Sequence, residues 1–162
     1  MSRHPTRNDL PARTRARIEK LLNERLAEAL DLAAAAKQAH WNARGAHFIA
    51  LHELFDKLHG AVEEHVDAMA ERISALGGQA LGTVQAAVRG SSLAAYPEAL
   101  SDGLEHVAAL SERVAAFGAQ VRKSIGKAGD LDDEGTADLL TGISRDLDKY
   151  LWFLEAHLPK AR

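Results

Sequence analysis

The fold is decided by Lys37–Glu71, KQAHWNARGAHFIALHELFDKLHGAVEEHVDAMAE. A predicted helix ends in this stretch, Gly45 turns the chain, and a second predicted helix follows over 47–76. Because successive residues of a helix turn by about 100°, the apolar side chains of the second helix share one arc. A separate narrow strip carries His52, Asp56, Glu63, Asp67 and Glu71. This helix therefore has one face for a core and another for polar chemistry.

The strip is too long to bind one metal ion. At about 1.5 Å of rise per residue, His52 and Glu71 lie about 28 Å apart along the axis. Each end carries an i, i+4 pair on adjacent turns, His52 with Asp56 and Asp67 with Glu71. We expect two copies to pack antiparallel about a two-fold axis near the small residues at 60 and 61. Such a pair holds two identical sites, each built from both chains.

His40 completes the candidate site, because a hairpin at Gly45 brings the end of the first helix back toward His52. The predicted ligands are His40, His52 and Asp56 of one chain with Asp67 and Glu71 of its mate. Histidine and carboxylate ligands suit ferrous iron and related divalent ions, whereas zinc more often takes additional histidine or thiolate ligands. An i, i+4 His/Asp pair is also common as a surface ion pair, so a plain helical scaffold without chemistry stays an alternative.

Motifs and residue types that the sequence lacks narrow the kinds of site that it can form. No Glu is followed three residues later by His, which disfavours the di-iron centre that ordinary bundles build from Glu-x-x-His pairs within one subunit. There are no cysteines, which excludes disulfides, thiolate ligands and cysteine nucleophiles. The start lacks an apolar secretory region and no apolar run has the length of a membrane span, so we expect a cytoplasmic protein without a membrane partner.

The two tryptophans, Trp41 and Trp152, have two alternative roles. They either supply an electron near an iron site or pack in the core.

Apolar spacing predicts four long helices, over 11–42, 47–76, 97–126 and 133–158. Pro97 suits the first position of the third helix, and Pro159 stops the fourth. Gly82 and Gly90 bracket a short apolar piece that fits a small helix in the crossover between helices two and three. One long crossover is typical of the ferritin-like variant of a four-helix bundle. We therefore expect an all-α fold with one domain over 11–158.

The two ends of the chain are expected to lie outside this domain, as a flexible basic arm over 1–10 and a short tail over 159–162. Residues 1–20 carry six Arg or Lys against two Asp or Glu, a balance of 6 − 2 = +4 in a chain of net charge −3. Such an arm can contact DNA phosphates without sequence preference through Arg3, Arg7 and Arg13. A solvated terminus without a partner is the alternative.

The segments KQAHWNARG, HELFD and DAMAER closely resemble the signature of the Dps family, the mini-ferritins also called DNA-binding proteins from starved cells. RDLDKYLWFLEAHL resembles that family's last helix, so the resemblance extends from about Asn8 to Leu158. It implies an iron-oxidising site between two subunits. The family's ligands map onto His40, His52, Asp56, Asp67 and Glu71, which all carry the family's residue type.

The resemblance further implies a hollow homododecamer with ferroxidase activity. Such a particle takes Fe(II) and hydrogen peroxide as substrates and stores Fe(III) as a ferric oxide mineral, which limits oxidative damage to DNA under stress. Acidic residues near the last loop line pores in the family, and the pool here is Asp130, Asp132, Asp133, Glu134 and Asp138. DNA-binding members commonly use lysine-rich mobile termini, whereas this arm is short and arginine-rich. Because the arm is still basic, a protein that compacts the nucleoid and has only a secondary iron site is a second hypothesis.

Overall fold

The computed structural model describes residues 4–158, and in that range it is all-α. Its helices are α1 (Ala12–Asn42), α2 (Phe48–Ala75), α3 (Val84–Gly90), α4 (Gly103–Gly129) and α5 (Glu134–Glu155). The predicted four long helices with a short extra helix in the second connection are confirmed. Arg3 and the predicted tail over 159–162 lie outside the described residues. None of the described helices is both long and apolar enough to cross a membrane.

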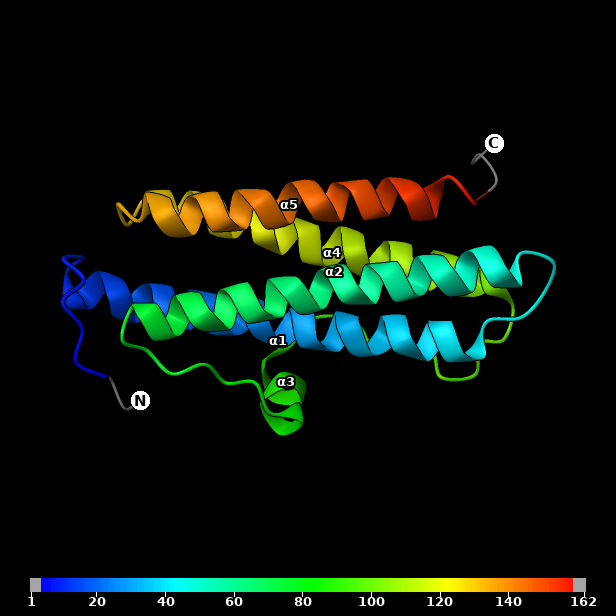
Figure 1. Ribbon diagram of the computed structural model, residues 1–162, viewed down its shortest axis with the longest axis horizontal. Coiled ribbons are helices and arrows are strands. Elements are labelled where there is room, and N and C mark those ends of the chain that lie inside the picture. Colours follow the sequence, from blue (N-terminus) through cyan, green and yellow to red (C-terminus); the bar gives the residue numbers. More distant parts are fainter. Residues whose placement is uncertain (1–3, 159–162) are drawn as a thin grey trace.

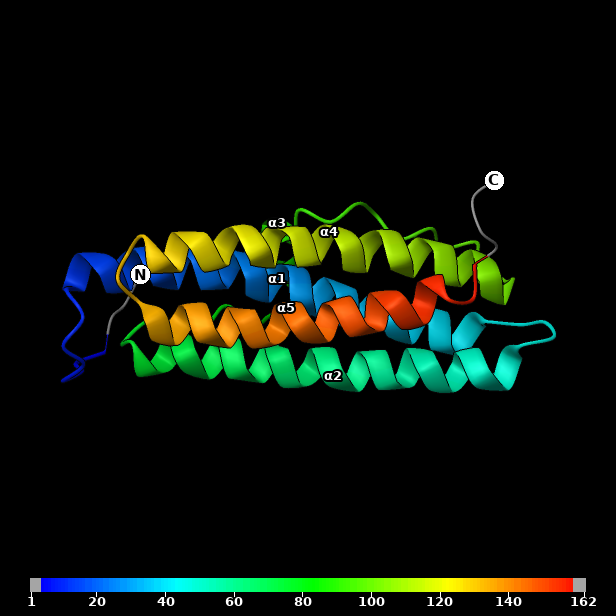
Figure 2. The same cartoon turned by 90° about the horizontal axis from the view of Figure 1, so that it is seen from above.

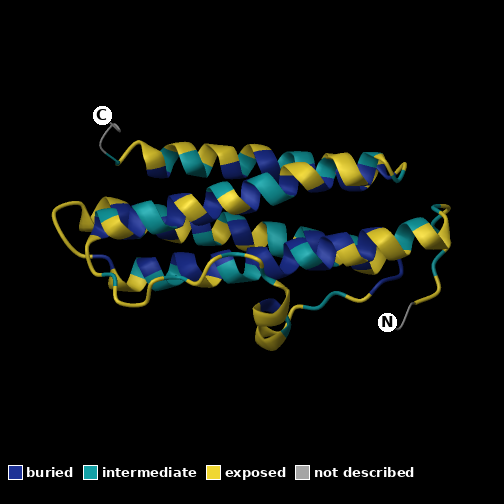
Figure 3. Ribbon diagram, turned by 180° about the vertical axis from the view of Figure 1, so that it is seen from behind, coloured by how far each residue is buried: buried dark blue, intermediate teal, exposed yellow. Residues whose placement is uncertain are grey.

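The four long helices form two antiparallel hairpins that lie side by side, α1 with α2 and α4 with α5 (Figures 1 and 2). The crossover between α2 and α4 runs the length of the bundle along α1, and its short helix α3 packs against the outer side of α1 (Figure 1). The apolar stripes of the long helices meet in one core, and their outer faces are exposed (Figure 3). Its largest fully buried side chains include Leu22, Phe55, Met69 and Phe117.

The predicted start of the third long helix is wrong, because α4 begins at Gly103 rather than at Pro97. Asp102 is the N-cap, and its carboxylate accepts from the backbone N–H groups of Leu104 and Glu105 at 2.9 and 3.4 Å. The chain before it is held extended against the end of α1, where Arg44 donates to the carbonyl of residue 101 and accepts from the N–H of Gly103. These contacts outweigh the local preference of proline for a helix start.

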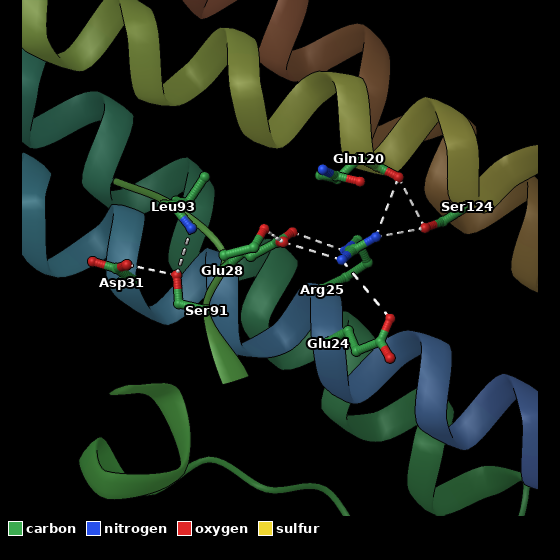
Figure 4. Close-up of polar contacts among 9 residues, drawn as sticks. Glu24, Arg25, Glu28, Asp31, Ser91, Leu93, Gln120 and Ser124 are labelled. Atoms are coloured by element: carbon green, nitrogen blue, oxygen red, sulfur yellow. Dashed lines mark hydrogen bonds and ion pairs between the residues drawn. The ribbon is translucent and has the colours of Figure 1, made fainter. Parts of the chain in front are cut away.

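A buried polar cluster ties the crossover and α4 to the middle of α1 (Figure 4). Arg25 is 6% exposed and Glu28 is fully buried, and Arg25 Nε lies 2.8 Å from Glu28 Oε2. Arg25 also donates to the hydroxyl of Ser124 on α4 at 3.0 Å, while Ser92 of the crossover donates to Glu28. A buried charge needs such partners, because taking it out of water is expensive. The cluster therefore fixes where the crossover lies on the bundle.

The described part of the N-terminal arm lies against the end of α2. The backbone N–H of His4 donates to the carbonyl of Gly77 at 2.9 Å. Gly77 has φ +79°, and a Cβ at this position would lie 2.7 Å from the carbonyl oxygen of His4, so glycine is required here. Arg15 of α1 donates to the carbonyls of Asn8 and Leu10 and holds the entry to the first helix.

Candidate metal centre

Two histidines meet where the first hairpin closes. His40 lies in the last turn of α1 and His52 in the second turn of α2, and Gly45 at φ +108° allows the tight connection between the helices. The imidazole rings stack with their centroids 3.7 Å apart and their planes at 21°. Both side chains are half-buried. The hairpin predicted from the sequence therefore brings His40 back to His52.

The backbone fixes the orientation of both rings. Nδ1 of His40 lies 2.8 Å from the carbonyl oxygen of His52, and Nδ1 of His52 lies 2.9 Å from that of His40. Because a carbonyl oxygen only accepts, each Nδ1 carries its hydrogen and donates it. In the neutral ring Nε2 then holds the free lone pair, which is the arrangement that metal-binding histidines commonly use. The two rings thus present two oriented nitrogens with free lone pairs.

Asp56 follows His52 by one helical turn and pairs with a lysine from α1. Its carboxylate is 52% exposed and accepts from the ammonium of Lys37. This hydrogen bond is the main cause that lowers the pKa of Asp56, against a smaller opposing effect of desolvation. Asp56 is therefore ionised at neutral pH and available to a cation. Lys37 is a residue of the site that sequence reasoning missed, since its pairing depends on how α1 and α2 cross.

Asp67 and Glu71 lie at the other end of the same continuous helix. Both are exposed, and neither side chain makes a hydrogen bond or an ion pair with another described residue. Asp56 and Asp67 are separated by about 16 Å along the helix axis, at about 1.5 Å per residue. Among the residues that the structure describes, no three His, Asp or Glu side chains of one chain gather closely enough to hold a metal ion.

Three further side chains differ from, or add to, the sequence-based picture. Trp41 and Trp152 are 67% and 65% exposed, so neither packs in the core of the single chain. Asp133, counted among the acidic residues near the last loop, is 2% exposed and serves as the N-cap of α5. It also pairs with Arg72 at 2.7 Å. Its carboxylate is used inside the bundle, whereas Asp130, Asp132, Glu134 and Asp138 are exposed.

Known proteins resemble this chain in both architecture and sequence. A family model described as a ferritin-like domain matches residues 19–162. The DNA protection during starvation protein of Agrobacterium fabrum is 46% identical over 160 residues, which cover 99% of both chains. The chain belongs to the Dps family. A second Dps-family relative, DNA protection during starvation protein 2 of Bacillus anthracis, is 34% identical and covers 87% of this chain and 96% of its own.

Solved Dps structures superpose on nearly all of this Dps chain. DpsA14 from Streptomyces coelicolor has a TM-score of 0.93 at 35% identity and covers 99% of this chain and 95% of its own. A tetragonal crystal form of Mycobacterium smegmatis Dps has a TM-score of 0.92 at 33% identity and covers 96% of this chain and 95% of its own. The ferritin-like architecture, including the long crossover, is therefore that of this family.

Proposed function

We propose that this Dps protein is a ferroxidase and iron store whose oxidation sites are shared between two subunits. Each site takes His40, His52 and Asp56 from one chain and Asp67 and Glu71 from its two-fold mate. The observation that carries the proposal is the pair of imidazoles whose Nδ1 atoms are occupied by backbone carbonyls. Two oriented Nε2 atoms and three carboxylates make a mixed nitrogen and oxygen set, which suits Fe(II).

The two ends of α2 support the two-chain arrangement. A Cβ placed on Gly60, midway between them, meets no atom of the described chain within 4 Å. A second helix can therefore approach closely at this point, and an antiparallel crossing brings the His/Asp end of one copy to the Asp/Glu end of the other. Two-fold symmetry then completes both sites at once. We further propose that such pairs assemble into a hollow homododecamer that keeps the ferric product inside as a mineral.

The chemistry removes both reactants of hydroxyl-radical formation. Two Fe(II) ions give up one electron each, and one hydrogen peroxide molecule takes both electrons and two protons to form two waters. The carboxylates of the site favour the ferric product, because added positive charge is stabilised by nearby negative charge. We propose that the protein protects DNA in the bacterial cytoplasm in this way, which agrees with the names of its relatives.

Ferric absorbance after mixing Fe(II) with hydrogen peroxide tests the proposal. The double variant H52A/D56A removes two of the five ligands from every site, and we expect its initial rate to fall at least about a hundredfold. His59→Ala is the matched control, because His59 lies on the same helix but binds the carbonyl of Ala33. A normal rate in H52A/D56A, or an equal loss in His59→Ala, would remove these residues as the site.

DNA contact by the N-terminal arm is a second proposed function. Arg7 of the arm and Arg13 in the first turn of α1 are exposed and make no ion pair with another described residue. Arg15, in contrast, holds two backbone carbonyls and is structural. A particle with many copies of the arm gains binding strength from multivalency even when each arm binds weakly. Association with the nucleoid follows from this proposal rather than from the iron site.

A gel shift with duplex DNA tests the arm. The triple variant R3Q/R7Q/R13Q keeps Arg15 and the described contacts of the arm, and we expect it to lose the shift at a salt concentration where the wild type still binds. The wild-type shift should weaken steeply as salt is raised, because phosphate contacts release counterions. A triple variant that shifts DNA as well as the wild type does would exclude the arm.

A further inference from the structure

Tyr96 lies in the crossover before α4 and points its hydroxyl at a buried histidine. The Tyr96 hydroxyl is 2.6 Å from Nδ1 of His106, and the two rings stack with planes 12° apart. His106 is 1% exposed, and its Nε2 has no partner among the described residues. Burial lowers the pKa of His106 and raises the pKa of Tyr96 to about 12. The phenol therefore keeps its proton, and in the tautomer of the neutral imidazole that carries its hydrogen on Nε2 the phenol donates to Nδ1.

The surroundings hold this pair in place. The guanidinium of Arg113 lies 5.9 Å from the centre of the Tyr96 ring, and Asp31 pairs with Arg113 at 2.5 Å. A phenol that donates to a neutral imidazole can lose an electron and a proton together, because the proton moves along an existing hydrogen bond to a base. The second of the two tyrosines lacks such a base: the Tyr150 hydroxyl donates to the backbone carbonyl of Lys57 at 3.1 Å.

Phe55 lies between the Tyr96–His106 pair and the candidate metal centre. The ring of Phe55 meets His106 edge to face, with centroids 6.4 Å apart, and Phe55 is fully buried. Phe55 follows His52 by three residues on α2, so their Cβ atoms are neighbours at about 5–6 Å. His52 in turn stacks on His40. Ring contacts thus lead from Tyr96 through His106 to Phe55, which lies one helical turn from the predicted ligand His52.

We propose that Tyr96 and His106 form a proton-coupled electron donor that serves a site holding a single Fe(II) when it meets hydrogen peroxide. The proposal rests on the iron oxidation proposed above. Peroxide needs two electrons to become water, and one Fe(II) supplies only one. Without a second donor, cleavage of the O–O bond releases a hydroxyl radical. Tyr96 supplies the missing electron instead.

The electrons and protons of this step are all accounted for by Fe(II), Tyr96, His106 and solvent. One electron leaves Fe(II) and one leaves Tyr96, the O–O bond of the peroxide breaks, and two protons from solvent complete two waters. The phenolic proton of Tyr96 moves to Nδ1 of His106. The products are Fe(III), a neutral tyrosyl radical, an imidazolium and two waters. The carboxylates of Glu105 and Asp102 favour the imidazolium by Coulomb attraction. A later reductant, such as another Fe(II), restores the tyrosine as the proton returns.

Freeze-quench electron paramagnetic resonance of the assembled protein tests the pair. The sample receives less than one Fe(II) per subunit without oxygen and then one equivalent of hydrogen peroxide. We expect a tyrosyl signal that narrows when the protein contains ring-deuterated tyrosine. The signal should vanish in Tyr96→Phe and persist in Tyr150→Phe. Spin-trapped hydroxyl radical should rise several-fold in Tyr96→Phe but stay at the wild-type level in Tyr150→Phe.

His106→Asn tests the base without removing the tyrosine. An asparagine amide oxygen can accept the Tyr96 hydrogen bond but cannot take up its proton, so the radical yield should fall about tenfold or more. Ferric absorbance is recorded in the same samples. A wild type that oxidises iron without any tyrosyl signal, or a signal that survives Tyr96→Phe, would overturn the pair and leave the ferroxidase standing. Absence of ferric absorbance in the wild type would overturn both.

Discussion

At the scale of single residues, the candidate site combines two imidazoles oriented by backbone carbonyls with a carboxylate that is paired with a lysine. The imidazoles of His40 and His52 are fixed by main-chain carbonyls, which no substitution elsewhere can remove. Asp56 is instead paired with Lys37, whose ammonium has to leave that carboxylate when a cation binds there. The lysine therefore opposes binding in two ways, as a rival partner and as a nearby positive charge.

Replacing Lys37 with glutamine should strengthen metal binding. The change frees Asp56 and removes one positive charge beside the site, and for an exposed pair we expect about a threefold gain in Fe(II) affinity. Anaerobic Fe(II) titration followed by calorimetry measures it. Lys57→Gln is the control, because Lys57 is an exposed lysine of α2 without a part in this ion pair. Weaker binding in Lys37→Gln would mean that the lysine positions Asp56 rather than competing for it.

The buried His106 should make the stability of the protein fall in mild acid. Its pKa in the folded state is lowered, chiefly by burial, below the ordinary value of 6.5. The unfolded chain therefore binds the proton first as pH falls. The contribution is complete above about pH 6.5 and is lost below it, at no more than about 1.4 kcal/mol per pH unit.

Urea unfolding of the metal-free protein between pH 7.5 and 5.0 measures this loss. The comparison is with His106→Asn, which keeps the other seven histidines and lacks only this contribution. We expect the wild type to lose more stability than His106→Asn over that range. Parallel pH profiles of the two proteins would show that His106 does not carry the effect.

At the scale of helices, the sequence predicted elements best where an apolar stripe is long and a breaker is close. The first helix was predicted over 11–42 and observed over Ala12–Asn42, because its stripe runs unbroken up to the turn at Gly45. The start of α4 was missed because Pro97 and Asp102 are competing start signals, and the contacts of Arg44 decide between them. The local sequence pattern carries no information about such tertiary contacts, so it could not decide between the two starts.

The candidate site, too, could be predicted from the sequence only in part. Helical spacing places His52 and Asp56 on one strip, and the turn at Gly45 suggests that His40 returns to it. The carbonyl contacts of the two imidazoles and the Lys37 partner of Asp56 need the relative rotation of α1 and α2. That rotation follows from how the apolar stripes pack together, which a one-dimensional pattern leaves open.

The buried pair Arg25–Glu28 gives a test of how the crossover is anchored. Arg25→Met leaves the fully buried Glu28 without its cation, and breaking such a pair should destabilise the protein by about 3–5 kcal/mol. The double variant R25M/E28L removes both charges and should recover most of that loss. Urea unfolding measures both variants. Arg122→Ala is the control, because the Arg122–Asp148 pair is about half exposed and should contribute less than about 1 kcal/mol. A double variant no more stable than Arg25→Met would contradict this account.

At the scale of the whole molecule, the central question is whether one chain or two build the site. The structure places His52, with His40 of α1 stacked on it, near the start of α2 and the Asp67/Glu71 pair near its end. If the site is shared across a two-fold axis, two variants that lack different halves of the site should complement each other in a mixed pair. Subunits carrying H52A/D56A lack one half of the site, and subunits carrying D67A/E71A lack the other half.

Co-expressing the two variants in equal amounts, each with its own affinity tag, should restore iron oxidation that neither shows alone. Half of randomly formed two-fold pairs are mixed, and each mixed pair holds one intact site of its two, so particles carrying both tags should reach about a quarter of the wild-type rate. A site contained within one chain gives no recovery, because each variant chain is then damaged. Particles of the same size that carry both tags but stay inactive would therefore rule out sharing between subunits, since assembly itself has succeeded in them.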